Sequence, residues 1–186
     1  MTFAHFVAIA SVVGEDEIPP PSDVITTGEG YIGRTVDVQI DAEDILWLGE
    51  NNPDWFTGIE DVVTWGWVLE EGVQLPFGTW GSPRIEVGQQ YIIPFVLAPG
   101  EDGVSVWTAL SSAATLPYDG EFITTDGIIG NDPSPILSEM EGQNALALVG
   151  ELQLAAGLTS LDTKYADLDP DARTQAVLRE RGQIKP

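Results

Sequence analysis

The sequence lacks cysteine and is poor in histidine and in cations. None of its 186 residues is cysteine, one is histidine, and seven are lysine or arginine. The absence of cysteine excludes a disulfide scaffold, a cysteine nucleophile and a thiolate metal site, and it leaves the cellular compartment open. No apolar run approaches the ~18 to 20 residues that a membrane helix requires, so the sequence predicts no membrane span.

The sequence is rich in apolar and acidic residues. Hydrophobic residues make up 43% of the chain, and 30 acidic residues give a formal net charge of −23. This hydrophobic content is too high for a disordered acidic tail, and the chain is long enough to bury a core without disulfides. The composition therefore predicts a soluble globular domain.

The negative charge is concentrated in the first part of the chain. Residues 1–163 carry 26 acidic residues and two arginines, a formal charge of −24, whereas residues 164–186 carry four acids and five bases, a charge of +1. An anionic body repels phosphate backbones and anionic lipids, so the sequence disfavours a nucleic-acid partner. Two interpretations stay open: the acidity serves solubility or adaptation to high salt, or it selects a basic partner or a cation.

Residues 1–130 show the alternation of apolar and polar residues that is typical of β-strands. The pattern predicts strands at Phe3–Val13, covered on both faces, at Ile32–Ile40, with one core face, and at Ile59–Leu69. Residues 14–30 read as a long surface loop, and residues 72–83 as a connection rich in glycine and proline. This segment is therefore predicted to be an acidic β-barrel body.

Large rings and one proline refine this prediction. Four tryptophans within predicted strands are expected to fill the core, with the first two of them on one face of the same strand. They are Trp65, Trp67, Trp47 and Trp107. A further strand over residues 91–97 contains Pro94, which cannot donate to a ladder and so predicts an edge strand or a bulge.

Residues 131–186 change to the period of an amphipathic helix. Helices are predicted at Pro135–Glu141, where Ser134 precedes a proline in the first helical position, at Gln143–Ala156, and at Asp171–Arg181. We expect this C-terminal segment to be a helical appendage that packs on the barrel or on a partner.

Two segments of the body resemble a known type of domain. The stretch Gly33–Trp47 and the motif VGxxYxI at Val87–Ile93 resemble netrin-like and metalloproteinase-inhibitor-type OB-fold domains, and also uncharacterised domains of actinobacterial exported proteins. The resemblance covers residues 3–125. It implies a mainly β fold, an OB-like (netrin-like) antiparallel barrel followed by C-terminal helices. Inhibitors of that type use an N-terminal cysteine, which this chain lacks, so no functional residue is carried over.

Catalytic and cofactor motifs give little support to an enzyme. Gly28–Gly33 has the letters GxGxxG but precedes a predicted strand instead of opening a helix, so it is read as a flexible loop. His5 lies among apolar residues and is expected to be a hydrogen-bonded core or edge residue. The sequence predicts no cofactor and no metal site; an irregular calcium cage built from oxygen ligands of residues 41–44 and 51–54 stays open as an alternative.

Three aromatic residues in glycine-rich or polar segments are the candidate contacts. Trp55 and Phe56 follow Asn51–Asp54, and Trp80 lies between two glycines; turn chemistry at these places favours exposure. The sequence thus predicts a non-catalytic binding or assembly module with a strongly acidic surface, which binds a protein partner, a second copy or a glycan. The alternative is a carbohydrate-active protein, either a glycan-binding module or a carboxylate-based glycoside hydrolase. The protein is expected outside the cytoplasm if residue 1 begins a trimmed mature domain, and in the cytoplasm otherwise.

Overall fold

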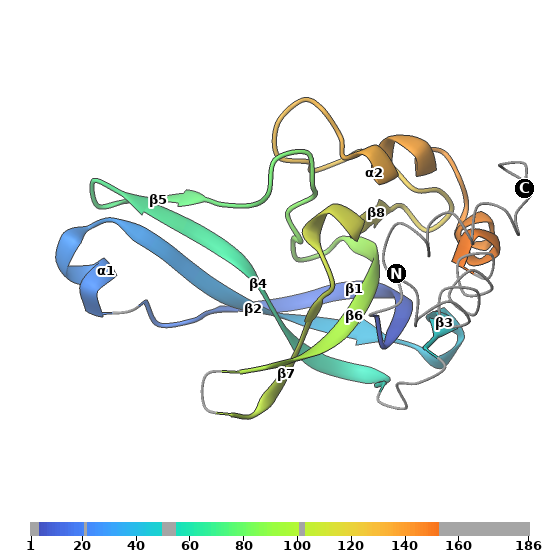
Figure 1. Ribbon diagram of the computed structural model, residues 1–186, viewed down its shortest axis with the longest axis horizontal. Helices are drawn as coiled ribbons and strands as arrows, with labels where there is room; N and C mark the ends of the chain where they lie inside the picture. The colour runs from blue at the N-terminus through green and yellow to red at the C-terminus, as the bar shows by residue number, and fades with distance from the viewer. Residues whose placement is uncertain (1–3, 21, 50–54, 101–102, 153–186) are drawn as a thin grey trace, which may run out of the picture. The chain divides into compact units, whose positions relative to one another are not determined.

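The structure is a computed structural model that describes residues 4–20, 22–49, 55–100 and 103–152. The described residues up to Leu148 form one compact unit (Figure 1). Its strands and α-helices are β1 (Phe6–Glu17), α1 (Ser22–Thr27), β2 (Gly30–Ile40), β3 (Ile45–Leu48), β4 (Gly58–Glu70), β5 (Val73–Pro76), β6 (Gln90–Pro99), β7 (Ser105–Ala109), β8 (Leu116–Tyr118) and α2 (Pro135–Met140). Two short 3₁₀ turns accompany them, η1 (Ala42–Asp44) and η2 (Ser112–Ala114).

Five of the strands close into a barrel. β1 pairs with β2, β2 with β4, β4 with β7, β7 with β6, and β6 again with β1, so the sheet returns to its first strand. All of these pairs are antiparallel except β4 with β7, which run parallel over two residue pairs. Five-stranded barrels of this kind are OB-like. The predicted fold class, a mainly β OB-like barrel followed by helices, is confirmed.

The barrel core consists of the inward side chains of these strands. The predicted core face of β2 is confirmed, because every second residue from Ile32 to Ile40 is buried. On β1 the face that includes Phe6 and Val12 is buried, whereas Val13 on the other face is exposed. The sequence predicted that both faces of this strand are covered, but this holds only for the residues before Val13.

The acidic segment after this point is a strand, so the prediction of a surface loop over residues 14–30 is wrong at residues 14–17, which belong to β1, and at residues 22–27, which form α1. β1 continues to Glu17 in antiparallel pairing with β2, and α1 follows before β2 begins. Glu15 forms an ion pair with the guanidinium group of Arg34 on β2. A carboxylate is tolerated in this part of the strand because it has a charged partner.

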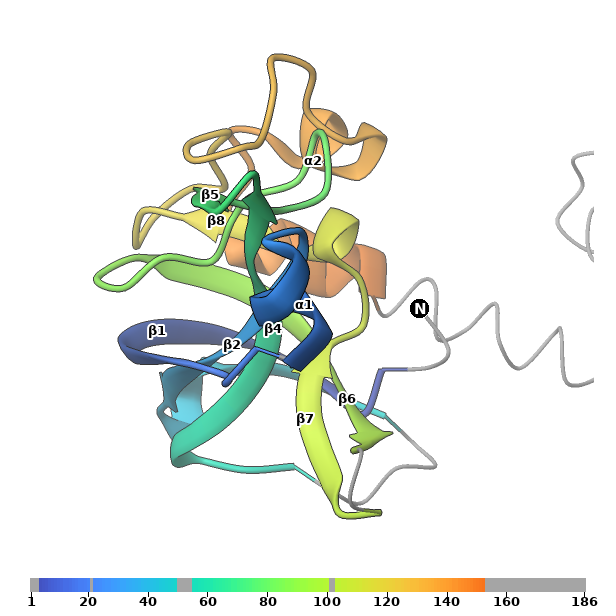
Figure 2. The ribbon, with the colours of Figure 1, turned by 90° about the vertical axis from the view of Figure 1, so that its left-hand side faces the viewer.

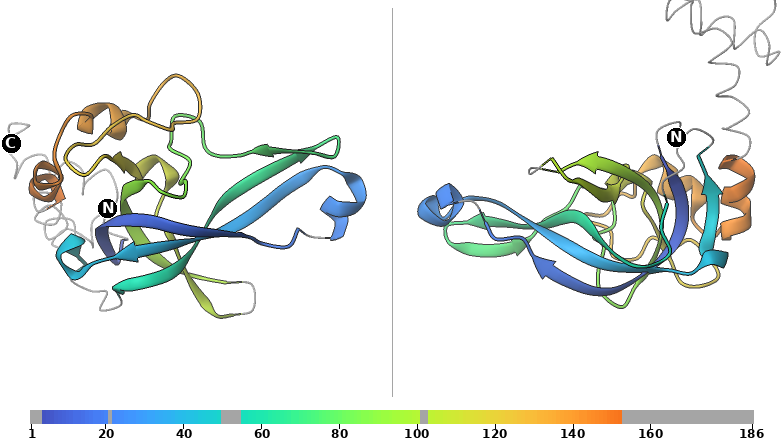
Figure 3. Two further views of the ribbon diagram at one scale, coloured as in Figure 1. Left: turned by 180° about the vertical axis from the view of Figure 1, so that it is seen from behind. Right: turned by 90° about the horizontal axis from the view of Figure 1, so that it is seen from below.

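β2 and β4 are longer than the barrel requires, and their far ends project from it. We call this projection the extension; it consists of residues 30–32 of β2 and of residues 67–76, which comprise the end of β4, the turn after it and β5. β5 pairs with β4 in a hairpin and occupies part of what the sequence predicted as an irregular connection. Figures 1 and 3 show the extension to one side of the barrel with α1 at its tip, and Figure 2 shows it end-on.

β6 is an interior strand of the sheet with partners on both sides, although Pro94 predicted an edge strand or a bulge. β6 pairs with β1 on one side and with β7 and β8 on the other. On that second side Ile92 pairs with Leu116 of β8, and Phe95 pairs with Ala109 of β7. Pro94 lies between these two pairings, so its missing N–H falls where the ladder changes partner.

The helices follow the barrel, as predicted. The Ser134 hydroxyl accepts a hydrogen bond from the Leu137 N–H at 3.3 Å and so caps α2, with Pro135 in the first turn. Residues 145–152 are helical as well. The predicted helix at Asp171–Arg181 lies outside the described residues, and the predicted division of the chain at residue 130 stays a prediction.

Candidate functional site

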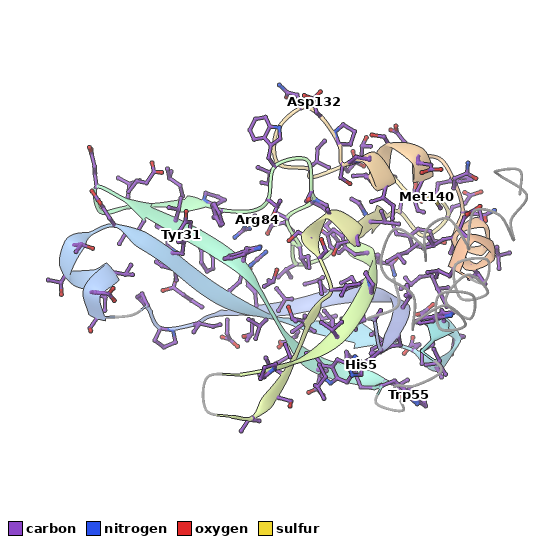
Figure 4. All side chains as sticks on the ribbon, viewed as in Figure 1. His5, Tyr31, Trp55, Arg84, Asp132 and Met140 are labelled. Atoms are coloured by element: carbon purple, nitrogen blue, oxygen red, sulfur yellow. The ribbon has the colours of Figure 1, made fainter. Side chains whose placement is uncertain are left out.

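The three aromatic residues that the sequence singled out do not form one surface. Trp55 is 47% exposed and lies at the lower edge of the unit in Figure 4. Trp80 is 68% exposed, and its ring lies against Gly130. The segment that contains Gly130 also contains Asp132, which Figure 4 shows at the opposite edge of the unit from Trp55. The two exposed rings therefore belong to separate surfaces.

Phe56 is turned towards the barrel core. Its ring centroid lies 5.3 Å from that of Phe6, 5.5 Å from that of Phe95 and 5.3 Å from that of Trp107. Aromatic pairs at such distances stabilise a core beyond their area burial. Phe56 thus covers one end of the barrel, while Trp55 beside it is exposed; the assignment of Trp55, Phe56 and Trp80 to partner binding stays a prediction.

Trp65 is exposed, and its predicted place in the core is wrong. In the ladder between β4 and β2, Trp67 pairs with Ile32 but Trp65 pairs with Gly33, so Gly66 is an extra residue in a β-bulge. An extra residue reverses the alternation of side chains along a strand. Trp67 therefore faces inward with Ile32, whereas Trp65 faces outward and is 49% exposed.

Two buried arginines hold this bulge. The Arg34 Nε donates to the Trp65 carbonyl at 3.1 Å, and the Arg84 Nη2 donates to the Gly66 carbonyl at 3.0 Å. The two guanidinium carbons lie 5.8 and 5.4 Å from the ring centre of Trp67, which allows cation–π attraction to both. The carbonyls that the bulge displaces from the ladder thus have donors, as buried carbonyls require.

Glutamates balance the charges of both arginines. Arg34 forms ion pairs with Glu15 and, at 3.7 Å, with Glu86, and Arg84 forms one with Glu86. We call these four residues with Trp67 the arginine cluster. Residues 4–152 contain no other lysine or arginine, and both arginines are buried. The described surface is therefore acidic and carries no lysine or arginine side chain.

Trp65 borders a groove on the outer face of β2, β4 and β7. Its volume is about 410 Å³, and we call it the aromatic groove. Tyr31 and Trp65 contribute rings to it, and Thr108, Ser111 and Ser112 contribute hydroxyl groups. No acidic or basic residue lines it. An uncharged concavity is distinctive on a surface that is otherwise rich in carboxylates.

A third ring supports the two aromatic residues of the groove. The Phe77 ring centroid lies 4.7 Å from that of Tyr31 and 5.5 Å from that of Trp65. Tyr31 is 58% exposed. Phe77 therefore restrains two large exposed rings, and exposed aromatic rings of this kind are typical anchors of binding surfaces.

Two carboxylates lie farther along the same outer face. Asp37 of β2 and Asp61 of β4 are directly paired across the ladder. The hydrogen bond between their carboxyl groups raises the pKa of Asp37, and partial burial and repulsion from Asp61 and Asp16 add to the effect. This pair can share a proton, but neither carboxylate lines the aromatic groove.

The remaining groups offer little chemistry. The His5 Nδ1 accepts a hydrogen bond from the Leu97 N–H at 3.4 Å, and its ring lies edge-on to Trp107, as expected for a satisfied edge residue. Within the described ranges no group of three or more histidine, aspartate or glutamate residues is placed to hold a metal ion. Residues 51–54, whose one acid is Asp54, lie outside those ranges. None of the helices in the described part is long and apolar enough to cross a membrane.

Trp65 and Tyr31 were not among the functional candidates that the sequence predicted. Both residues lie in regular strand patterns, where a ring is usually buried. The available signal was Gly66 between two tryptophans, because a glycine inside a strand pattern indicates a bulge or a close approach of backbone. The exposure of Tyr31 had no comparable signal.

No family model, curated protein or solved structure matches the chain. The resemblance to netrin-like and metalloproteinase-inhibitor-type domains therefore stays a prediction, and so does the resemblance to actinobacterial exported domains.

Proposed function

We propose that this protein is a non-catalytic binding module that holds its ligand in the aromatic groove. The observation that carries the proposal is the exposure of Tyr31 and Trp65 in an uncharged concavity of about 410 Å³. Ligand sites are typically concave and apolar with a few polar groups that fix orientation. The groove also lies on the second and third strands of the barrel, the face that OB-folds use for ligands, which is support by analogy of fold.

A neutral glycan is the ligand class that the lining supports best. The faces of sugar rings carry C–H groups that pack on aromatic rings, and Tyr31 and Trp65 offer two such rings in one groove. The Thr108 hydroxyl donates its proton to the Val63 carbonyl at 3.0 Å and can therefore only accept from a sugar hydroxyl, whereas those of Ser111 and Ser112 can donate and accept. Because the surrounding surface is acidic, sulfated glycans and nucleic acids are expected to be repelled.

The lining favours binding over hydrolysis. A glycoside hydrolase of the common type needs two carboxyl groups that flank the scissile bond, roughly 5 to 9.5 Å apart. No carboxylate lines the aromatic groove, and Asp37 and Asp61, which are paired with each other across the ladder, lie outside it. These observations support the binding module over the carboxylate-based hydrolase.

A glycan array probed with the full chain tests the proposal. We expect neutral glycans to bind, and we expect Tyr31→Ala and Trp65→Ala each to weaken binding by about 30-fold, which is the scale of an interface anchor. Trp80→Ala is the matched control, because Trp80 is at least as exposed but lies outside the groove. Its binding should equal that of the wild type.

Three results would contradict the proposal. Binding that survives in both groove variants would show that the site lies outside the aromatic groove. Binding lost in Trp80→Ala would place the site at Trp80. Release of chromophore from chromogenic glycosides by the wild type would show catalysis. Melting temperatures of all variants separate loss of binding from loss of fold.

A further inference from the structure

The extension presents a second concave surface, which adjoins the aromatic groove at Tyr31. We propose that the outer face of the extension is a docking site for a polypeptide segment of another protein that combines aliphatic side chains with lysine or arginine. The site consists of side chains of β4, of β5 and of the turn between them, with Glu29 beside them, and it does not require the aromatic groove to bind a glycan. We call this surface the extension face and define it by Val68, Glu70, Glu71, Val73 and Leu75.

Strand register places aliphatic side chains in adjacent rows on this face. Val68 is paired directly with Tyr31 of β2 on one side and with Leu75 of β5 on the other. In the next row Glu70 is paired with Val73. Val73 and Leu75 are both exposed, and the residues line a concavity of about 790 Å³. Aliphatic side chains gathered in an exposed concavity are typical of an interaction surface.

Carboxylates border the same concavity. Glu29, Glu70 and Glu71 line it together with the aliphatic residues. The ion pairs of the described residues all lie in the arginine cluster, so none of these three glutamates has a cationic partner there. Lysine and arginine carry apolar stems and charged tips, and they can contact the aliphatic rows while their charges reach the glutamates.

The free edge of β5 favours a polypeptide over a glycan. Among the described strands β5 pairs with β4 alone, so its other edge is not used in the sheet. An extended segment can pair with such an edge through its own N–H and C=O groups and present alternate side chains to the face. A glycan has no such main-chain groups.

A second copy of the chain does not fit this surface. In a twofold interface each copy would bring its own Glu29, Glu70 and Glu71 against those of the other copy. Like charges in contact oppose association. The same charges repel nucleic acid and anionic membranes, which leaves a basic and aliphatic partner as the complementary occupant.

Fluorescence anisotropy with labelled peptides tests the proposal on the full chain. The probe is a short peptide that alternates lysine and valine, and the comparison peptides replace valine by serine or lysine by glutamate. We expect the lysine–valine peptide to bind, the lysine–serine peptide to bind about tenfold more weakly, and the glutamate–valine peptide not to bind.

Paired variants locate the binding. Val73→Ser with Leu75→Ser, and separately Glu70→Gln with Glu71→Gln, should each weaken the lysine–valine peptide by about tenfold. The matched control is Glu121→Gln with Asp126→Asn, which removes the same charge from exposed positions elsewhere; it should change binding less than about twofold. Trp65→Ala should leave peptide binding unchanged, so failure of the aromatic groove is distinguishable from failure of this site.

Four outcomes would overturn the proposal. They are no binding of the lysine–valine peptide, equal binding of the lysine–serine peptide, an equal loss in the control variant, and a dimer in sedimentation that Val73→Ser with Leu75→Ser abolishes. The first three remove the aliphatic or local electrostatic basis, and the last makes a second copy the occupant. Melting temperatures confirm that each variant is folded.

Discussion

Arg34 and Arg84 are buried residues that determine how a side chain on the outer surface, Trp65, is placed. Both are buried beside Trp67, and each donates a hydrogen bond to a carbonyl of the β4 bulge. Glu15 and Glu86 balance their charge, as a buried cation requires. Because the bulge turns Trp65 outward, the arginine cluster supports the aromatic groove although neither arginine is exposed.

Asp37 is the residue for which we predict a pH effect on stability. Its pKa in the folded protein is raised above the ordinary 3.8 by the hydrogen bond with Asp61, by partial burial and by nearby carboxylates. The folded state therefore holds this proton more tightly than the unfolded state, so the contribution of Asp37 to stability falls as pH rises from about 3.8 through the raised pKa. We expect Asp37→Asn to raise the melting temperature at pH 7 and to lose this advantage at pH 3.

Asp119 is the control with the opposite sign. Its carboxylate accepts hydrogen bonds from the N–H groups of Phe122 and Glu121, at 2.7 and 2.8 Å, and these lower its pKa. Its stabilising contribution is present above pH 3.8 and is lost as pH falls through the lowered pKa. Asp119→Asn should therefore lower the melting temperature at pH 7. If Asp37→Asn also lowers it, the assigned repulsion at Asp37 is wrong.

Among the secondary-structure elements, β4 has the largest influence on the candidate surfaces. Its first half closes the barrel against β2 and β7, and its second half forms the extension with β2 and β5. The bulge at Gly66 lies between these halves. One strand therefore contributes to the core, to the aromatic groove and to the extension face.

We predict that Gly66→Ala lowers the stability of the protein at the bulge of β4. A methyl group at Gly66 would lie 2.5 Å from the Ile32 carbonyl oxygen, in a place where backbone must move to admit it. Overpacking of this kind costs about 2 kcal/mol, which chemical denaturation can measure. We also expect Gly66→Ala to weaken ligand binding in the groove, because Trp65 is the adjacent residue.

Gly150→Ala is the matched control for this substitution. Gly150 lies in the helical residues 145–152, and within the described part of the chain no atom lies within 4 Å of the position that a methyl group would take. Alanine is favoured over glycine in a helix by about 0.5 to 1 kcal/mol. A loss of stability in Gly150→Ala equal to that in Gly66→Ala would show that the cost does not come from the bulge.

For the molecule as a whole, the uneven balance of acidic and basic residues is the feature with the largest expected effect on stability. The chain has a formal net charge of −23, and the two arginines of the described residues are buried in ion pairs with Glu15 and Glu86. No surface lysine or arginine in residues 4–152 offsets the remaining carboxylates. Repulsion between them opposes the compact state.

Stability should therefore rise with salt. Mobile ions screen exposed charges beyond a Debye length of about 10 Å at 0.1 M and about 3 Å at 1 M. We expect the melting temperature to increase between low and molar sodium chloride, as measured by circular dichroism. An unchanged or lower melting temperature would show that the carboxylates are already spaced well enough, and it would remove the support for salt adaptation.

Local patterns in the sequence determined much of the fold. The alternation in β2, the cap at Ser134 and the change of period after the barrel each depend on neighbouring residues, so they were predictable. The acidic end of β1 was not, because its carboxylate finds its partner only across the sheet, on Arg34. Composition likewise predicted the acidic surface, but not the burial of both arginines.

Only the tertiary structure decided where the candidate surfaces lie. The aromatic groove brings together Tyr31, Trp65 and Ser112, which are far apart in the chain, and it exists because β7 closes the barrel against β4. The bulge at Gly66 adds one residue to β4, and that addition is defined only by pairing with β2. A period-2 pattern records alternation along one strand, whereas exposure depends on what the neighbouring strands cover. For this reason the sequence predicted strands correctly around Trp65 and yet assigned its ring to the core.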